Sequence, residues 1–194
     1  PLVIGECKTP VRPAVSWVDG AIQLEQYQKT IPQIFVPNIF CFATEGKDYR
    51  AGSIQMPVEK WQPWRESTDK FLGNFKDMEN AVKLMLKPDV ILDILQNFNL
   101  YSTNKGGKKI KILCRYQQYY ATKQIVKRVV DGRIRKGLIW HFQGSGKTFL
   151  MLYAAMQLRY KPELKNPTVI VVVDRVDLNS QMRANFNASG VPNT

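Results

Sequence analysis

The sequence has few of the residues that build disulfide frameworks and structural metal sites. Its 194 residues include three cysteines and one histidine. The cysteines are far apart and no C-x-x-C pair occurs, so a structural zinc site is not expected. The three cysteines are therefore interpreted as buried free thiols in a reducing cytosol, which predicts a cytoplasmic protein.

Long apolar runs and a signal sequence are also missing. No stretch approaches the roughly 18 apolar residues needed to cross a bilayer, and no basic amphipathic helix of the membrane-surface type stands out. We therefore expect no membrane partner. The chain opens at Pro1, in what reads as the body of a strand, without an initiator Met. We expect the protein to begin upstream of this residue.

Acidic residues are scarce relative to basic ones. Lys and Arg number 28 against 16 Asp and Glu, which gives a net charge of +12 at pH 7. This surplus favours a polyanionic partner, and without membrane signals nucleic acid is the better choice. Hydrophobic residues make up 44% of the chain, enough for a folded core in one or two domains.

The first half of the chain shows mixed strand and helix patterns. Strands are predicted at 1–7, 39–43 and 49–54, and the last two read as a hairpin. Ser16 can cap a helix that runs to about Lys29 and stops before Pro32. Two further helices are predicted at 71–86 and 89–98.

The second half alternates between helix and strand. It follows the basic, glycine-rich stretch 104–109, which is the best candidate for a boundary. The predicted order is helix 117–131, strand 137–141, helix 147–159, strand 169–173 and helix 177–186. Apolar strands alternating with helices are typical of a parallel sheet covered by helices, so the predicted fold class is α/β.

The most informative motif is Gly144-Ser145-Gly146-Lys147-Thr148, between a predicted strand and a predicted helix. Glycines let the backbone wrap a phosphate, and the helix N-terminus points free N–H groups at the anion. The ammonium of Lys147 can reach the outer phosphates of ATP, and the hydroxyl of Thr148 can bind its Mg²⁺. His141 stands where the full pattern has glycine, so only the core of the pattern matches. A chance glycine-rich turn is the alternative.

A weaker pattern lies near the start of the chain. Glu6 and Lys8 are two apart in a predicted strand, so their side chains share a face. A carboxylate that holds Mg²⁺ beside a lysine suits metal-dependent phosphodiester cleavage. Gln23 and Tyr27 are four apart and share a face of the next helix. The alternatives are a surface ion pair and a tyrosine docked on the core.

Taken together, these motifs make the chain resemble, over nearly its whole length, the restriction subunit of type I restriction-modification enzymes. Residues 1–8 look like the second half of that family's PD-(D/E)xK nuclease site, and 23–27 look like its Q-x-x-x-Y element. Segment 115–121 is similar to the segment that reads adenine, which places the reader at Gln118, with Gln117 as the alternative. Segment 140–148 resembles the family's phosphate loop. Segment 172–181 looks like motif Ia, which contacts DNA.

The resemblance implies a division of the chain. Residues 1–65 would be the C-terminal part of a nuclease domain with a restriction-endonuclease-like mixed sheet. Residues 66–104 would be a helical connector, and 105–194 the N-terminal part of the first RecA-like ATPase domain. Glu6, Lys8, Gln23 and Tyr27 would be catalytic, with Glu6 on the metal.

The resemblance also implies an activity. The intact subunit would use ATP and Mg²⁺ to pump and cleave double-stranded DNA, together with methylation and specificity subunits. An Asp before Pro1 and a D-E-x-H segment after Thr194 are expected outside this chain, so the chain alone is expected to be inactive. Two alternatives stay open: a translocase without a working nuclease, and a non-catalytic nucleic-acid-binding module.

Overall fold

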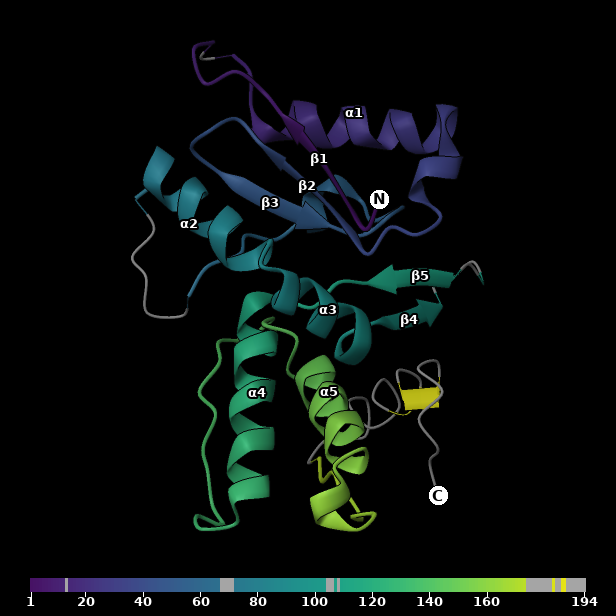
Figure 1. Cartoon of the computed structure of the whole chain (residues 1–194), viewed down its shortest axis with the longest axis vertical. Helices are drawn as coiled ribbons and strands as arrows, with labels where there is room; N and C mark the ends of the chain where they lie inside the picture. Colours follow the sequence, from purple (N-terminus) through teal and green to yellow (C-terminus); the bar gives the residue numbers. More distant parts are fainter. Residues whose placement is uncertain are drawn as a thin grey trace.

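The computed structural model describes residues 1–12, 14–66, 72–103, 107, 109–173, 183, 186 and 187 (Figure 1). Its strands are β1 (Val3–Cys7), β2 (Phe40–Thr44), β3 (Tyr49–Gly52), β4 (Leu100–Thr103) and β5 (Lys109–Ile112). Its α-helices are α1 (Trp17–Thr30), α2 (Phe75–Met85), α3 (Pro88–Asn97), α4 (Tyr116–Asp131) and α5 (Lys147–Arg159). Short 3-10 turns are η1 (Pro32–Phe35), η2 (Val58–Lys60) and η3 (Pro162–Leu164). The α/β class is confirmed.

A three-stranded mixed sheet forms the N-terminal end of the molecule. β1 pairs parallel with β2, and β2 pairs antiparallel with β3, as expected for the predicted hairpin. Helix α1 lies along one face of this sheet (Figure 1). It begins as predicted: the Ser16 hydroxyl accepts the N–H of Val18 at 3.2 Å, and Asp19 accepts the N–H of Ser16 at 2.8 Å. This capping box satisfies N–H groups that the first turn leaves free.

A second hairpin, β4–β5, was not predicted: no strand was expected at 100–103 or 109–112, and β5 begins within the stretch 104–109 that reads as a loop. Two hydrogen bonds attach it to the first sheet. The Ser53 hydroxyl donates to the carbonyl of Lys111 at 2.5 Å, and the Lys111 ammonium donates to the carbonyl of Asn38 at 2.9 Å. These bonds fix β5 to the segment after β3 and to the segment before β2.

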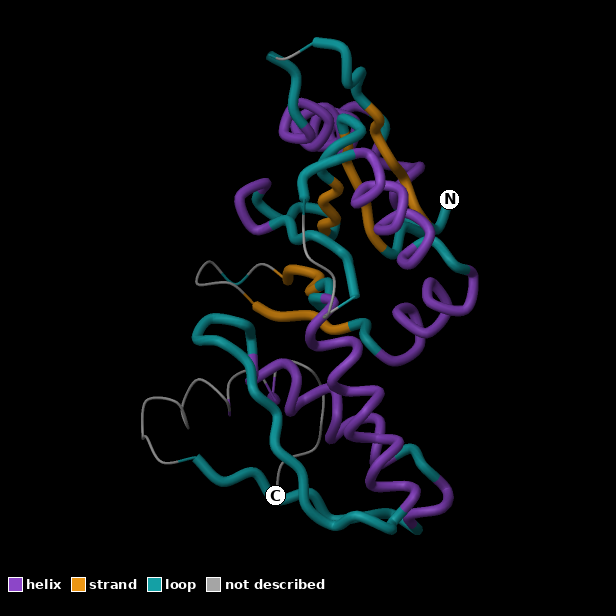
Figure 2. Tube along the Cα trace, turned by 90° about the vertical axis from the view of Figure 1, so that its left-hand side faces the viewer, coloured by secondary structure: helices purple, strands orange, loops and turns teal. Residues whose placement is uncertain are grey.

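Helices α4 and α5 confirm two predicted helices, but the strands predicted around them are absent. Residues 137–141 and 169–173 are loop in the described structure, as the long loop segments of Figure 2 show. Leu138, Trp140, Ile170 and Val172 are 87%, 89%, 80% and 87% exposed. An apolar strand is stable only beside strands that satisfy its backbone, and no described strand pairs with these segments. The prediction of strands here is wrong for this structure.

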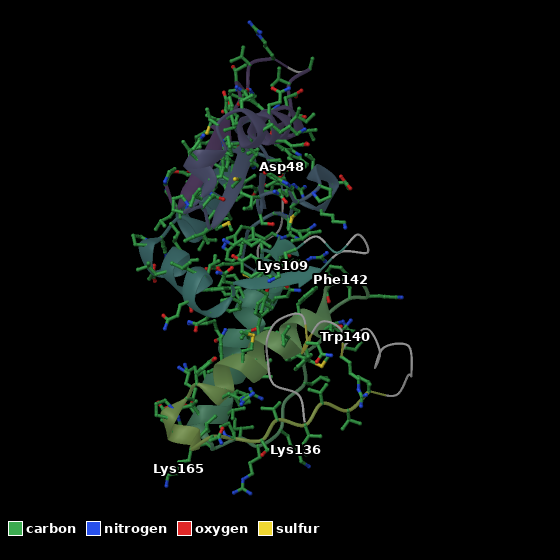
Figure 3. The ribbon with its side chains drawn as sticks, turned by 90° about the vertical axis from the view of Figure 1, so that its right-hand side faces the viewer. Asp48, Lys109, Lys136, Trp140, Phe142 and Lys165 are labelled. Atoms are coloured by element: carbon green, nitrogen blue, oxygen red, sulfur yellow. The ribbon has the colours of Figure 1, made fainter. Side chains whose placement is uncertain are left out.

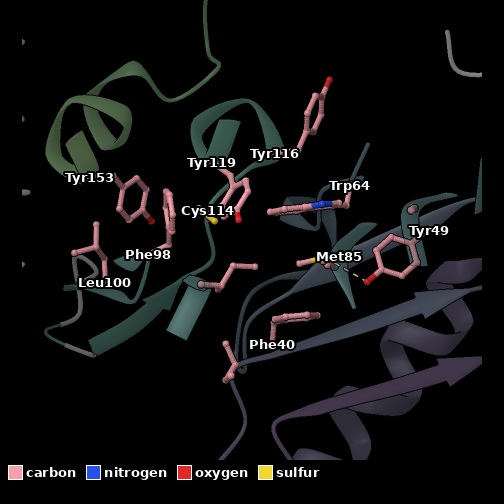
Figure 4. Close-up of a cluster of buried hydrophobic side chains, with 14 of the residues drawn as sticks. Phe40, Tyr49, Trp64, Met85, Phe98, Leu100, Cys114, Tyr116, Tyr119 and Tyr153 are labelled. Carbon is pink, nitrogen blue, oxygen red and sulfur yellow. Dashed lines mark hydrogen bonds between the residues drawn. The ribbon is translucent and has the colours of Figure 1, made fainter. Parts of the chain in front are cut away.

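One hydrophobic core runs from the first sheet to α5 (Figure 4). Phe40 and Tyr49 enter it from the sheet, and Tyr153 enters it from α5. Aromatic contacts link its middle: the ring centroid of Phe98 lies 4.9 Å from that of Tyr119 and 5.0 Å from that of Tyr153. The core therefore crosses the predicted boundaries near 65 and 104, although the division itself remains a prediction.

The three thiols are free, and they differ in exposure. Cys41 and Cys114 are buried as expected, and burial raises the pKa of the Cys41 thiol to about 12. Cys7 is exposed, so the expectation of burial is wrong for this residue. It ends β1 and alternates with Glu6, so the two side chains point to opposite faces.

None of the described helices is both long and apolar enough to cross a bilayer.

Candidate functional site

The four residues expected to form a nuclease site lie in one series of hydrogen bonds. The Lys8 ammonium lies 3.1 Å from Glu6 Oε1 and also donates to Gln23 Oε1. The Gln23 amide nitrogen in turn donates to the Tyr27 hydroxyl oxygen. The structure thus brings together residues from β1 and α1, and it places the lysine between a carboxylate and an amide oxygen.

A glycine that the sequence analysis missed allows this approach. Gly20 lies in α1 directly over the sheet. A Cβ placed there would come within 3.2 Å of the Ala43 Cβ and 3.4 Å of the Glu6 Cγ. Gly20, Gln23 and Tyr27 are spaced by three and four residues, so they share one face of α1. The spacing of Gly20 from Gln23 and Tyr27 could have indicated from the sequence that this face of α1 packs closely on the sheet.

Arg50 is a second residue that the sequence analysis missed. Glu6 pairs with Ala43 and Ala43 pairs with Arg50, so these three positions form one row across the sheet. The Cα atoms of Glu6 and Arg50 are therefore about 10 Å apart, two strand spacings. The Arg50 guanidinium donates to Asp48 at 2.8 and 2.9 Å and lies 5.5 Å from the ring centroid of Trp17. A cation thus shares the α1 face of the sheet with Glu6.

Metal ligands around Glu6 are too few for a complete site. Among the described residues, no group of three or more His, Cys, Asp or Glu side chains lies close enough to hold a metal ion. The Glu6 carboxylate has the oxygen donors that Mg²⁺ prefers, but one of them is already paired with Lys8. Glu6 can therefore supply one ligand, and further ligands must come from elsewhere.

The predicted phosphate loop ends at the first turn of α5. Gly144 and Gly146 both have φ of +80°, a left-handed conformation that suits glycine, and Lys147 begins the helix. The Lys147 ammonium donates to the carbonyl of Phe142 at 2.9 Å, and the N–H of Ser145 donates to the same oxygen at 3.4 Å. A phosphate bound in the loop would compete with this carbonyl for both donors.

Thr148 and His141 flank this loop. Thr148 is in the first turn of α5, next to Lys147, as the motif requires. The ordinary pKa of His141 is 6.5; burial lowers it, and the positive charge of Lys147 lowers it further. His141 is therefore neutral at pH 7 and adds no charge to the loop.

Gln118 lies against the phosphate loop and is 3% exposed. Its amide oxygen accepts the N–H of Arg115 at 2.8 Å, and its amide nitrogen donates to the carbonyl of Gly146 at 2.9 Å. Gln117, the alternative adenine reader, lines a cavity of about 1200 Å³ together with Arg65 and Tyr116. The structure therefore brings Gln118 to the loop and leaves Gln117 facing open space.

Most of the segment predicted to be motif Ia lies outside the described residues. Val172 and Val173 are described, but Asp174 and the residues that follow in that motif lie outside the described residues.

Comparison with known proteins gives a family for the C-terminal part of the chain and relatives for nearly the whole chain. Residues 117–194, which hold most of α4, the glycine-rich loop and α5, match the SWI2/SNF2 ATPase family. Over 97% of its length the chain is 34% identical to the type I restriction enzyme HindI endonuclease subunit of Haemophilus influenzae.

Two further relatives are putative type I restriction enzyme endonuclease subunits of Methanocaldococcus jannaschii, MjaVIIIP and MjaVIIP. Each is 32% identical, over 93% and 97% of the chain. The chain belongs to the family of type I restriction enzyme endonuclease subunits, as a segment of them. It spans 18–19% of the length of these curated relatives.

Proposed function

We propose that the chain is part of the ATP-dependent, DNA-translocating and DNA-cleaving subunit of a type I restriction-modification complex. The observation that carries the proposal is the hydrogen-bonded series from Glu6 to Tyr27. It occurs in a chain that also has a glycine-rich loop and a lysine at the start of α5. The relatives named as endonuclease subunits support the same function.

In the proposed nuclease reaction each of the four residues has its own task. Glu6 would hold Mg²⁺, which activates water and stabilises the charge on the phosphate when bound. Lys8 would orient the attacking water or stabilise the charge that develops on the scissile phosphate. Gln23 holds the Lys8 ammonium, and Tyr27 holds the Gln23 amide, so both would act by positioning. Residues 1–65 would be the C-terminal part of this nuclease domain.

In the proposed motor the loop binds ATP. Lys147 would contact the outer phosphates, Thr148 would bind Mg²⁺, and the N–H groups at the start of α5 would face the phosphate oxygens. An amide before the loop, at Gln118 or Gln117, would read adenine. These residues would belong to the N-terminal part of a RecA-like domain that begins near residue 105, after a connector at 66–104.

The proposed partners are double-stranded DNA and the methylation and specificity subunits, in the cytoplasm. The net charge of +12 suits contact with phosphates, which carry no sequence information. Base-specific recognition would therefore belong to another subunit.

Paired ATPase and cleavage assays on the reconstituted full-length complex test this function. Glu6→Ala should abolish strand cleavage while DNA-stimulated ATP hydrolysis continues, because Glu6 lies more than 130 residues before the loop and is no part of it. Lys147→Ala should abolish both activities, because cleavage would follow translocation. Glu25→Ala is the matched control, since Glu25 is an exposed acid of α1, paired only with Lys29.

The outcomes separate the alternatives. Persisting cleavage by Glu6→Ala would leave a translocase in which Glu6 and Lys8 form a structural ion pair. ATP turnover by Lys147→Ala at the normal rate would refute the motor assignment. DNA binding without either activity in the wild-type complex would leave a non-catalytic nucleic-acid-binding module.

A further inference from the structure

The carbonyl groups of the phosphate loop are bonded to residues at the start of α4. Arg115 Nη1 donates to the carbonyl of Gly144 at 2.7 Å. Gln118 Nε2 donates to the carbonyl of Gly146 at 2.9 Å and lies 3.4 Å from that of Ser145. Three successive carbonyls therefore face the start of α4, although Arg115 and Gln118 precede the loop by more than twenty residues in the chain.

This arrangement decides where the N–H groups of the loop point. A trans peptide is planar, so its N–H points away from its own C=O. Because the carbonyls of Ser145 and Gly146 face α4, the N–H groups of Gly146 and Lys147 face the opposite side. Successive N–H groups that converge in this way form a nest that binds anions.

The Gln118 side chain packs closely against the loop and is held in one orientation. The N–H of Arg115 fixes the amide oxygen of Gln118, and this orients the amide nitrogen toward the loop. A Cβ at Gly146 would displace that nitrogen, and the φ of +80° at this position favours glycine. Both the amide oxygen and the amide nitrogen of Gln118 thus have hydrogen-bond partners within the protein.

We propose that Arg115 and Gln118 are positioning residues that hold the phosphate loop in its anion-binding conformation. The proposal rests on the function proposed above, in which this loop binds ATP. Both residues then set the affinity for the triphosphate, whatever base it carries. The preference for adenine belongs to Gln117, whose side chain lines the cavity beside Arg65 and Tyr116.

Magnesium tripolyphosphate, a ligand without a base, tests this proposal on the full-length subunit. Its affinity is compared with those of ATP and GTP for wild type, Arg115→Ala, Gln118→Ala and Gln117→Ala. Loss of one such hydrogen bond corresponds to about a tenfold weaker affinity. We expect Arg115→Ala and Gln118→Ala to weaken all three ligands by about this common factor. Gln117→Ala should change only the ratio of ATP to GTP affinity.

Controls come from outside both the loop and the cavity. Arg159, at the end of α5, and Gln26, in α1, are exposed, so Arg159→Ala and Gln26→Ala remove a cation and an amide without touching either. Arg115 is only half-buried, so Arg115→Ala keeps the test valid even if the Gln118 variant does not fold.

Three results would contradict what is proposed, and they are distinguishable. Unchanged tripolyphosphate affinity in both Arg115→Ala and Gln118→Ala overturns the positioning role. A changed ATP to GTP ratio in Gln118→Ala, with tripolyphosphate unaffected, makes Gln118 the base reader and also overturns it. If Lys147→Ala binds every ligand as wild type does, the loop does not bind nucleotide and the proposed function itself fails.

Discussion

At the residue scale, Lys8 is the side chain whose position depends most on its neighbours. Lys8 directly follows β1, and its ammonium contacts Glu6 on that strand and Gln23 on α1; each side chain is only partly exposed. A flexible lysine loses much conformational freedom when it is held at one place. Its position therefore depends on Gln23 as well as on Glu6.

Gln23→Leu should reduce cleavage about 10²-fold, because a misplaced catalytic group loses productive orientation. ATP hydrolysis should be unchanged, because the loop at Lys147 is not involved. Cleavage and ATPase rates of the reconstituted complex measure both. Gln26→Leu, at an exposed position of the same helix, is the control. Equal cleavage by the two variants would contradict the positioning role of Gln23.

Asp93 accepts three hydrogen bonds, two of which join α3 to α4. It accepts from Lys123 at 2.8 Å, from Tyr119 at 2.9 Å and from Asn97 at 2.6 Å. Burial would raise the pKa of this carboxyl, but the hydrogen bonds from these partners outweigh it, so its pKa lies below the ordinary 3.8. The ionised carboxylate is therefore favoured by folding.

The sign of the resulting pH dependence follows from this shift. A depressed folded pKa stabilises the protein above the unfolded pKa, and the stabilisation is lost as pH falls through the folded value. Asp93→Asn should lower the free energy of unfolding by about 1–3 kcal/mol at pH 7, and the difference should shrink below pH 3.8. Urea unfolding at pH 7 and pH 3 measures it, with exposed Asp131→Asn as the control. A difference independent of pH would contradict this account.

At the scale of elements, local chemistry explains which predictions succeeded. The capping residue Ser16, the stop before Pro32 and the periodicity of 147–159 are properties of single segments, and the helices followed. The α1 face with Gln23 and Tyr27 could be predicted for the same reason. Segments 137–141 and 169–173 could not be predicted correctly, because a strand depends on neighbours that its own residues do not reveal.

The close packing of α1 on the sheet gives a test at this scale. Replacing a helical glycine by alanine usually stabilises a helix by about 1 kcal/mol. At Gly20 the added Cβ would lie 3.2 Å from the Ala43 Cβ, so α1 would have to shift. Gly20→Val should lower stability by about 1–3 kcal/mol and reduce cleavage, as the shift separates Gln23 from Lys8. Thermal unfolding and cleavage assays measure this, with Ile22→Val, at a position 45% exposed, as the control. A higher melting temperature for Gly20→Val would contradict close packing.

At the scale of the molecule, the shared core links the sheet to α4 and α5. Phe98 is 1% exposed and contacts both Tyr119 and Tyr153. Neither this link nor the Ser53–Lys111 hydrogen bond could be predicted, because both join segments far apart in the chain. Local composition therefore suggested boundaries near residues 65 and 104, but the packed core extends across both.

A shared core should make the described parts unfold together. We expect one transition, and Phe98→Ala should destabilise β2 and α5 alike, by about 3–5 kcal/mol. Hydrogen exchange of amides in β2 and α5 under increasing denaturant measures the two ends separately. Phe75→Ala, at a position 63% exposed, is the control. Loss of protection in α5 well before β2 would show two independent units.

The exposed apolar segments around Trp140 and Ile170 have a consequence for colloidal behaviour. Figure 3 shows Trp140 and Phe142 on the same side of the molecule, between Lys109 and Lys136 along its length. Mutual repulsion between molecules of net charge +12 opposes contact between such segments at low ionic strength. Salt screens that repulsion and leaves the apolar attraction in place. Wherever these segments are uncovered, added salt will therefore promote self-association, while it would weaken the proposed attraction to DNA.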